Sequence, residues 1–154
     1  MPTILFFLGI LLSVSALQSA GVLGDLARWL DKHIHSVFPI AGVIGLLSSV
    51  IDNVPLVAAC MGIYPLPDAA ALASASDPAY LRNFAADGLF WQLLSFCAGV
   101  GGSLLIIGSA AGVVAMGLEK IEFGWYLRRI APAALVGYFA GIGLLYLEHL
   151  IFGL

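Results

Sequence analysis

Long uncharged stretches separate the charged residues of this chain. Asp, Glu, Lys and Arg are absent from four of them, at residues 1–24, 36–51, 88–118 and 130–147. A helix that crosses the hydrocarbon core of a bilayer needs about 20 mostly apolar residues. Three of the stretches approach or exceed that length, and 36–51 does not. The pattern therefore predicts an all-α membrane protein in which one apolar segment is too short to cross alone.

Two of the stretches predict simple spans, at about residues 3–23 and 130–150. The first lacks the basic start of a signal peptide, so we expect it to be retained as a span. After it, Leu26, Trp29 and Leu30 recur at helical spacing, which favours a helix lying in the membrane interface.

Residues 36–64 predict a re-entrant hairpin, which enters and leaves the membrane on one side. Two complete spans need about 40 residues plus a turn, and this segment has 29. Pro55 removes a backbone donor and disfavours helix at the residue before it. The helix should therefore break at about Asp52–Val54, leaving two half-length helices. A single broken span is the alternative, and the hairpin is favoured.

The stretch 88–118 predicts a discontinuous helix. A straight helix of this length would measure about 45 Å, against a hydrocarbon core of about 30 Å. Gly99, Gly101 and Gly102 lie near its middle and are followed by Ser103. We expect the helix to break at Gly99–Ser103.

The distribution of basic residues predicts the orientation. The short link Glu119–Arg129 contains Lys120, Arg128 and Arg129, which indicates a cytoplasmic loop. Residues 65–87 hold three prolines and three aspartates and predict a loop outside the bilayer. Because the hairpin returns to its side of entry, this loop should face the opposite side.

Two interrupted helices in one short chain are typical of a transporter binding site. Backbone outside a helix is tolerated at membrane depth only where it is buried in protein or lines a cavity, and the freed carbonyls and amides can hold an ion. Asp52 is the strongest candidate residue, since a carboxylate at this depth is costly and usually functional. An exposed position at the interface is the alternative for Asp52.

Neutral oxygens near the two breaks complete the candidate ion site. Ser48, Ser49 and Asn53 lie at the first break, and Ser103 and Ser109 at the second. A hard cation such as sodium is bound through oxygens of this kind. The alternative is that these side chains only satisfy backbone groups of their own segments.

Other classes of function find no support in the sequence. The chain is 62% hydrophobic and 10% charged, whereas about a quarter of a soluble domain is charged. Cys60 and Cys97 lie far apart, without the spacing of a redox or zinc site. There is no nucleophile–base arrangement, no phosphate loop and no basic patch. We expect neither an enzyme nor a nucleic-acid-binding protein, and neither a cofactor nor a metal besides the transported ion.

At this point two segments resemble a known family. Residues 46–64, LLSSVIDNVPLVAACMGIY, and 90–130, FWQLLSFCAGVGGSLLIIGSAAGVVAMGLEKIEFGWYLRRI, closely resemble the C-terminal half of NhaD-type sodium/proton antiporters. That family belongs to the ion transporter superfamily, with arsenite and dicarboxylate carriers. Residues 6–21 fit the preceding span, so the resemblance covers most of the chain.

The resemblance implies one repeat of an inverted-repeat transporter, whose hairpin and broken helix meet those of a second repeat around a midplane site. Ser48 and Asn53 match hairpin positions tied to cation handling, and Ser103 and Ser109 match the broken-helix motif. The usual motif reads more like GTGGS, and Val100 here removes one hydroxyl oxygen. The family has roughly twice as many spans, so the chain looks like a fragment, a split-gene subunit or a self-assembling half.

The sequence thus predicts part of a multi-pass sodium (or lithium)/proton antiporter of the cell (inner) membrane. Its expected partners are the bilayer and either the missing N-terminal repeat or a second copy. One alternative is an anion or organic-acid carrier of the same superfamily, but no Lys or Arg lies near either break. The other is a non-transporting subunit that packs through the GxxxG pairs Gly108/Gly112 and Gly137/Gly141.

Overall fold

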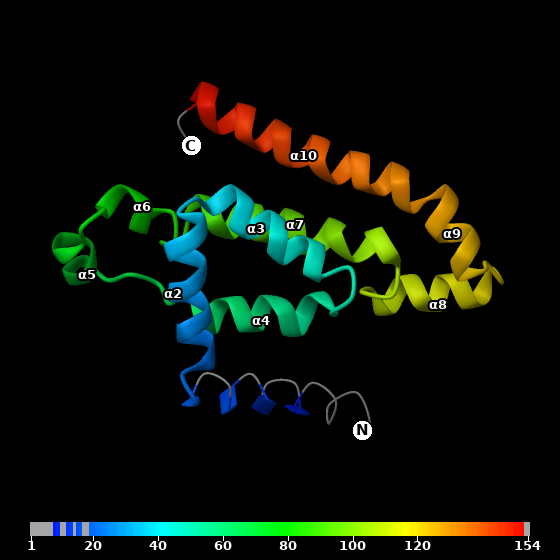
Figure 1. Cartoon of the computed structure of the whole chain (residues 1–154), viewed down its shortest axis with the longest axis horizontal. Helices are drawn as coiled ribbons and strands as arrows, with labels where there is room; N and C mark the ends of the chain where they lie inside the picture. Colours follow the sequence, from blue (N-terminus) through cyan, green and yellow to red (C-terminus); the bar gives the residue numbers. More distant parts are fainter. Residues whose placement is uncertain (1–7, 10–11, 14, 17–18, 153–154) are drawn as a thin grey trace.

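The computed structural model describes residues 8–9, 12–13, 15–16 and 19–152, and Figure 1 shows their arrangement. The regular structure of these residues is helical, without a strand, as expected of an all-α fold. The predicted first span at residues 3–23 lies largely outside the described residues.

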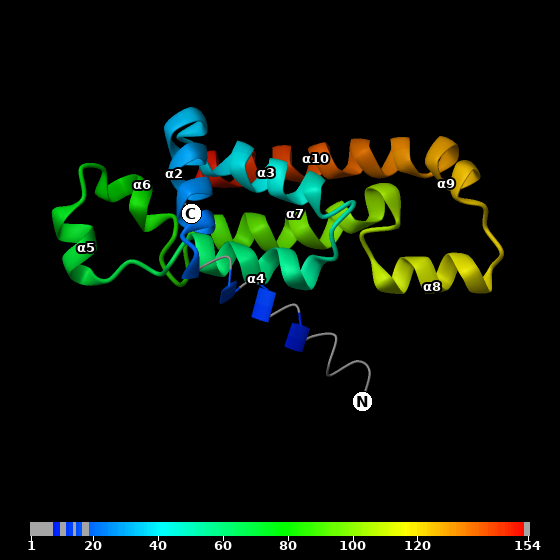
Figure 2. The same cartoon turned by 60° about the horizontal axis from the view of Figure 1, so that its bottom comes forward.

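Helix α2 (Val22–Ile34) runs across the direction of the other long helices (Figures 1 and 2). It follows Gly21, whose φ of 77° is a left-handed conformation that favours glycine. The spacing of Leu26, Trp29 and Leu30 predicted a helix here, and the structure has one; its place in the membrane interface stays a prediction.

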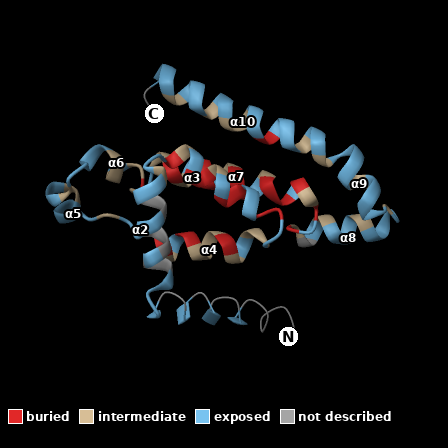
Figure 3. Ribbon diagram, in the orientation of Figure 1, coloured by how far each residue is buried: buried red, intermediate tan, exposed pale blue. Residues whose placement is uncertain are grey.

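Three apolar helices form the core: α3 (Val37–Leu47), α4 (Asn53–Ile63) and α7 (Leu89–Leu105). Helices α3 and α4 have 11 residues each and run antiparallel (Figure 1), joined by a link at residues 48–52. Figure 3 shows that the buried residues concentrate on these three helices and on the links at their ends. The large apolar side chains that are almost fully buried here are Ile40, Cys60, Phe90, Leu93, Leu94 and Cys97.

Gly45 lets α3 approach α7 at backbone distance. A Cβ atom at Gly45 would overlap Cys97 of α7 and the hydroxyl of Tyr138. Small residues of this kind allow helices in membranes to pack closely. The close contact between α3 and α7 is therefore possible only because Gly45 has no side chain.

The region 65–87, predicted as a loop, contains two short helices, α5 (Ala69–Ser74) and α6 (Pro78–Arg82). Each starts with an aspartate whose side chain accepts a backbone N–H, from Ala71 to Asp68 at 2.7 Å and from Tyr80 to Asp77 at 2.9 Å. Such caps satisfy amides that a helix start leaves without a partner. Two of the three aspartates that indicated a loop, Asp68 and Asp77, thus act as helix caps.

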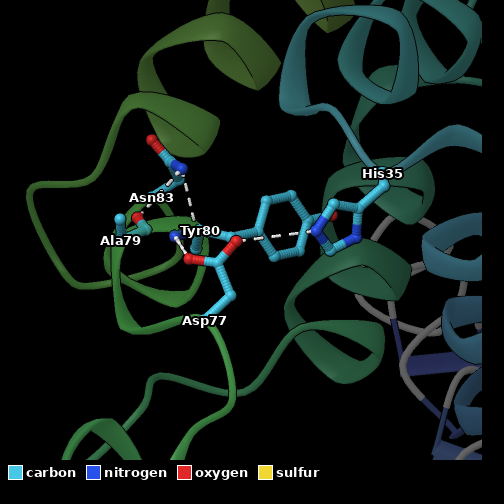
Figure 4. Close-up of polar contacts among 5 residues, drawn as sticks. All are labelled: His35, Asp77, Ala79, Tyr80 and Asn83. Carbon is cyan, nitrogen blue, oxygen red and sulfur yellow. Dashed lines mark hydrogen bonds and ion pairs between the residues drawn. The ribbon is translucent and has the colours of Figure 1, made fainter.

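Asp77 also connects this region to the corner between α2 and α3 (Figure 4). His35 stacks on the Tyr80 ring at 4.3 Å between centroids, and its Nε2 lies 3.6 Å from Asp77 Oδ2. The Tyr80 N–H bond, together with His35, lowers the pKa of Asp77. The residues just before α3 and those following α4 therefore lie at the same end of the molecule.

The position of the second helix break differs from the prediction. Helix α7 continues through Gly99–Ser103 and ends at Leu105, and Ile106 then adopts a left-handed φ of 61°. Helix α8 (Ala110–Leu118) starts at Ser109, whose Oγ accepts the N–H of Gly112 at 3.2 Å. The predicted position of the break was wrong: Gly101 and Gly102 lie inside the helix and admit close neighbours, Gly99 faces open space, and the chain turns at Ile106–Ser109.

Two helices complete the chain, the short α9 (Phe123–Arg129) and the long α10 (Ala131–Phe152). Pro132 follows the junction and lacks the N–H that would continue the hydrogen bonds of α9 into α10. Of the helices that the structure describes, only α10 is both long and apolar enough to cross a bilayer. It covers the predicted last span.

Tyr138 is the buried residue of α10 among those described, and its hydroxyl donates to Gly42 O of α3 at 2.7 Å. We expect Tyr138→Phe to lower the free energy of unfolding by about 0.6 to 1.5 kcal/mol, as loss of one such bond does. Tyr146→Phe on the same helix is the control, because that side chain is half exposed. The free energy of unfolding of both variants can be measured in detergent. Equal losses in the two variants would contradict this role of Tyr138.

Candidate functional site

Four helix ends meet where the 48–52 link touches the α7–α8 link. Helices α3 and α7 end there, and α4 and α8 begin there. The contact is direct, because a Cβ atom on Gly108 would overlap the backbone of Ser48 and Ser49. Helix ends leave carbonyl groups at one terminus and amide groups at the other without intrahelical partners. The junction therefore gathers backbone groups of both polarities in one place.

Two glycines of α7 make room for this junction. A Cβ atom on Gly101 would overlap Gly45 O and the Ser48 hydroxyl. A Cβ atom on Gly102 would lie 3.0 Å from Asn53 Oδ1 and 3.2 Å from Gly108 O. These two oxygens, one from each link, therefore face the same small space beside Gly102.

Asn53 is the first residue of α4, and its side-chain oxygen is buried. Within the part of the chain that the structure describes, this Oδ1 atom has no hydrogen-bond partner. A buried acceptor left in this condition costs about 1 to 3 kcal/mol. The atom is therefore suited to a ligand that brings positive charge or a donor, and a sodium ion meets that requirement.

The serine hydroxyls near the junction bind backbone groups. Ser48 Oγ is fully buried, 2.8 Å from Gly45 O and 3.0 Å from Ala98 O, so it joins α3 to α7. Ser49 Oγ donates to Leu46 O at 2.6 Å. These hydroxyls support the junction, and because they act as donors their lone pairs stay available to a cation.

The remaining predicted residues lie at different distances from the junction. Ser109 caps α8, and its Cβ atom lies 3.5 Å from the Cβ position of Gly102, so it belongs to the junction. Asp52 precedes α4 and is half-buried, with no cap hydrogen bond from its side chain. Pro55 lies in the first turn of α4, where its missing N–H is tolerated. Ser103 is exposed, and only its carbonyl is engaged, by the Tyr126 hydroxyl at 2.6 Å.

A pocket of about 260 Å³ opens beside Asn53, between α4 and α7. The other residues that line it are Val57, Trp91, Leu94, Ser95, Ala98 and Gly99. The Trp91 indole is held by a hydrogen bond from Nε1 to Phe84 O at 3.0 Å.

Sequence reasoning missed Ser95, although it shares a helical face with Gly99 and Ser103 at four-residue spacing. It also treated Gly108 only as part of a packing pair, whereas its carbonyl faces the Asn53 side chain.

The chain is similar to known membrane transporters. Residues 1–81 match the family described as citrate transporter. Over 90% of its length the chain is 53% identical to sodium/proton antiporter 1 and 52% identical to sodium/proton antiporter 2 of Arabidopsis thaliana. Over 96% of its length it is 37% identical to the Na(+)/H(+) antiporter NhaD of Vibrio cholerae. No solved structure matches it.

The matched part is a small share of these relatives. It makes up 21%, 29% and 27% of the two Arabidopsis proteins and the Vibrio protein, respectively. The chain therefore spans about a quarter of the length of the curated relatives it matches, less than the half that the number of spans predicts.

Two glycine substitutions in α7 test the close contact at the junction. We expect Gly101→Ala to lower the midpoint of thermal unfolding, because the new methyl group meets Gly45 O and the Ser48 hydroxyl, and overpacking typically costs about 1 to 3 kcal/mol. Gly99→Ala is the matched control, since nothing lies within 4 Å of its Cβ position. Alanine favours a helix over glycine by about 1 kcal/mol, so the control should be neutral or stabilised. Equal stability of the two variants in detergent would contradict the packing.

Proposed function

This chain belongs to the citrate transporter family, and from that premise we propose that it forms part of a multi-pass membrane carrier that exchanges sodium or lithium ions for protons. Its relatives are named sodium/proton antiporters, which supports an exchange of sodium ions for protons. The observation that carries the proposal is the buried Asn53 Oδ1, which has no partner in the described chain and lies, like the Gly108 carbonyl oxygen, beside Gly102. Oxygen atoms in this arrangement suit a hard cation.

The charges around the junction favour a cation over an organic anion such as citrate. The carboxyl ends of α3 and α7 and the amino ends of α4 and α8 meet there, so the helix dipoles favour neither sign. The charged residue type next to the junction is acidic, Asp52 before α4. Among residues 36–118, Arg82 is the sole Lys or Arg, and it belongs to α6, in the region that contacts the α2–α3 corner. A polyanion at this junction would have no basic side chain of these residues to bind.

Competition for one carboxylate would couple the two ions. Asp52 balances a sodium ion when ionised, and it releases that ion when it takes up a proton. Asn53, the serines and the Gly108 carbonyl supply neutral oxygens that hold the ion without adding charge. The remaining part of the carrier, or a second copy of this chain, completes the path on the other side.

The helix lengths support a re-entrant hairpin and a discontinuous helix. With 11 residues, α3 and α4 are each about 16 Å long, roughly half of a hydrocarbon core of about 30 Å. Both outer ends of this hairpin lie beside α2 (Figure 1), and α7, the 106–109 link and α8 continue toward the opposite end (Figure 2). In an inverted-repeat carrier, a second hairpin and a second broken helix would meet this junction from the other side.

Sodium-dependent stabilisation tests the site. We expect sodium to raise the unfolding temperature of the complete carrier in detergent, since a ligand at 100 times its Kd stabilises by about 2.7 kcal/mol. Asp52→Asn should remove most of this gain, and Asn53→Ala part of it. Asp87→Asn is the control, because Asp87 is exposed in the region before α7.

The alternatives give different outcomes in the same experiment. If Asn53 only ties up backbone at the hairpin tip, Asn53→Ala should destabilise the sodium-free carrier more than Asp52→Asn does. At an ion site it should leave the sodium-free carrier as stable or more stable, because a buried acceptor without a partner is removed. Stabilisation by citrate in place of sodium would indicate an organic-anion carrier, and a response to neither would indicate a packing subunit.

Cysteine labelling tests the hairpin. In the complete carrier we expect a cysteine at Ser76 and one at Glu119 to react with a membrane-impermeant maleimide from opposite sides, Glu119 from the cytoplasm. The buried Cys60 and Cys97 are first replaced by serine or alanine. A cysteine at the exposed Lys32, before the hairpin, should react from the same side as the one at Ser76. Labelling of these two positions from opposite sides would mean that 36–64 crosses the membrane.

A further inference from the structure

The segment around α9 combines basic and aromatic side chains at the start of the long apolar helix. Lys120, Arg128 and Arg129 are three of the six Lys and Arg residues of the chain. All three are exposed, and none forms an ion pair within the residues that the structure describes. Glu119 and Glu122 lie at the other end of the segment, so the positive charge is greatest beside α10.

Apolar side chains next to these charges are exposed as well. Trp125 is 51% exposed, Leu118 77% and Phe123 40%. A pocket of about 390 Å³ opens here, lined by Lys120, Ile121, Glu122 and Trp125. Tryptophan is enriched at the level of lipid headgroups, because its ring system is apolar at one end and carries a polar N–H at the other.

The fold holds this segment at a defined place. The Tyr126 hydroxyl donates to Ser103 O of α7 at 2.6 Å, and partial burial raises the pKa of Tyr126, so the donor stays protonated. Arg128 and Arg129 form the last turn of α9, directly before the apolar α10. With α10 spanning the bilayer, as its length and composition allow, the two guanidinium groups lie where the hydrocarbon core gives way to the headgroups.

We propose that residues 118–130 bind an anionic phospholipid, with its phosphate at Arg128 and Arg129 and its upper acyl chain against Trp125. Bidentate hydrogen bonds suit arginine to phosphate oxygens, and a basic residue near an anionic membrane surface adds roughly fivefold to binding. Charge complementarity selects the lipid as occupant, because a zwitterionic lipid offers no net charge to the three cations. The site depends on the chain being a membrane protein and is independent of which ion the carrier moves.

Brominated lipids that quench tryptophan fluorescence can test this site directly. The protein is reconstituted into phosphatidylcholine vesicles that contain a low fraction of brominated phosphatidylglycerol or brominated phosphatidylcholine. The difference between the native protein and its Trp125→Phe variant isolates the Trp125 signal. We expect several-fold stronger quenching of Trp125 by the anionic lipid, and weaker preference at high salt because the charges are screened.

Three variants separate charge from structure. In the double variant Arg128→Gln, Arg129→Gln, the two brominated lipids should quench Trp125 equally. In Arg128→Lys, Arg129→Lys, the anionic lipid should still quench Trp125 more strongly. Arg28→Gln, Lys32→Gln is the matched control in α2 and should behave as the native protein. Helix content by circular dichroism checks that each variant is folded.

Several results would overturn the proposal. Equal quenching of the native protein by both lipids would show that no anionic lipid is selected. An unchanged preference in the glutamine variant would place the selectivity elsewhere. Shielding of Trp125 from both lipids would show that another part of the protein covers this surface. None of these results depends on ion transport, so they leave the proposed antiport untouched.

Discussion

The backbone contact between the 48–52 link and α7 determines the rest of this structure. In the proposed re-entrant arrangement the α3–α4 tip lies at membrane depth, where no water satisfies its peptide groups and protein must do so. Gly45, Gly101 and Gly108 allow the approach, since a side chain at any of them would overlap backbone atoms across the contact. Ser48 then joins Gly45 O and Ala98 O from inside the interface. Without these small residues the hairpin could not lie against the break between α7 and α8.

The same contact explains why the junction is polar without being highly charged. The hydroxyls of Ser48 and Ser49 are directed to carbonyls, the Ser109 hydroxyl accepts the N–H of Gly112, and the nearby carboxylate of Asp52 is half-buried. Asn53 Oδ1 is the buried side-chain oxygen of the junction that is left over after this pairing. A neutral site of this kind costs less to bury when empty than a charged one, and the ion it receives supplies the missing partner.

Sequence reasoning located the interruption between α3 and α4 well, because it is signalled by segment length and by proline; re-entry on one side of the membrane stays a prediction. The interval between two polar links is too short for two spans, and Pro55 excludes a continuous helix, so the interruption was expected at nearly the place where α3 and α4 are joined. The glycines of α7 misled it, because a glycine that weakens a helix and a glycine that admits a neighbour look alike in one chain. Which role applies depends on Gly45 and Ser48, about 50 residues earlier, and no local pattern reports that contact. For the same reason Ser103 was grouped with Ser109, although α7 carries Ser103 to an exposed position.

The two arms of the hairpin are held unequally. Helix α3 buries Val37, Ile40, Ala41, Ile44 and Gly45, whereas α4 buries Leu56, Cys60 and Ile63 and keeps a pocket beside α7. Segments with fewer buried contacts open at lower free energy. Ser48 follows α3, the more deeply buried helix, and Asn53 begins α4, the less buried one. The junction therefore lies between a helix that is held firmly and one that is held less firmly. An ion bound at the junction would connect the two helices. When it leaves, α4 is the helix of the pair that moves at lower cost in free energy.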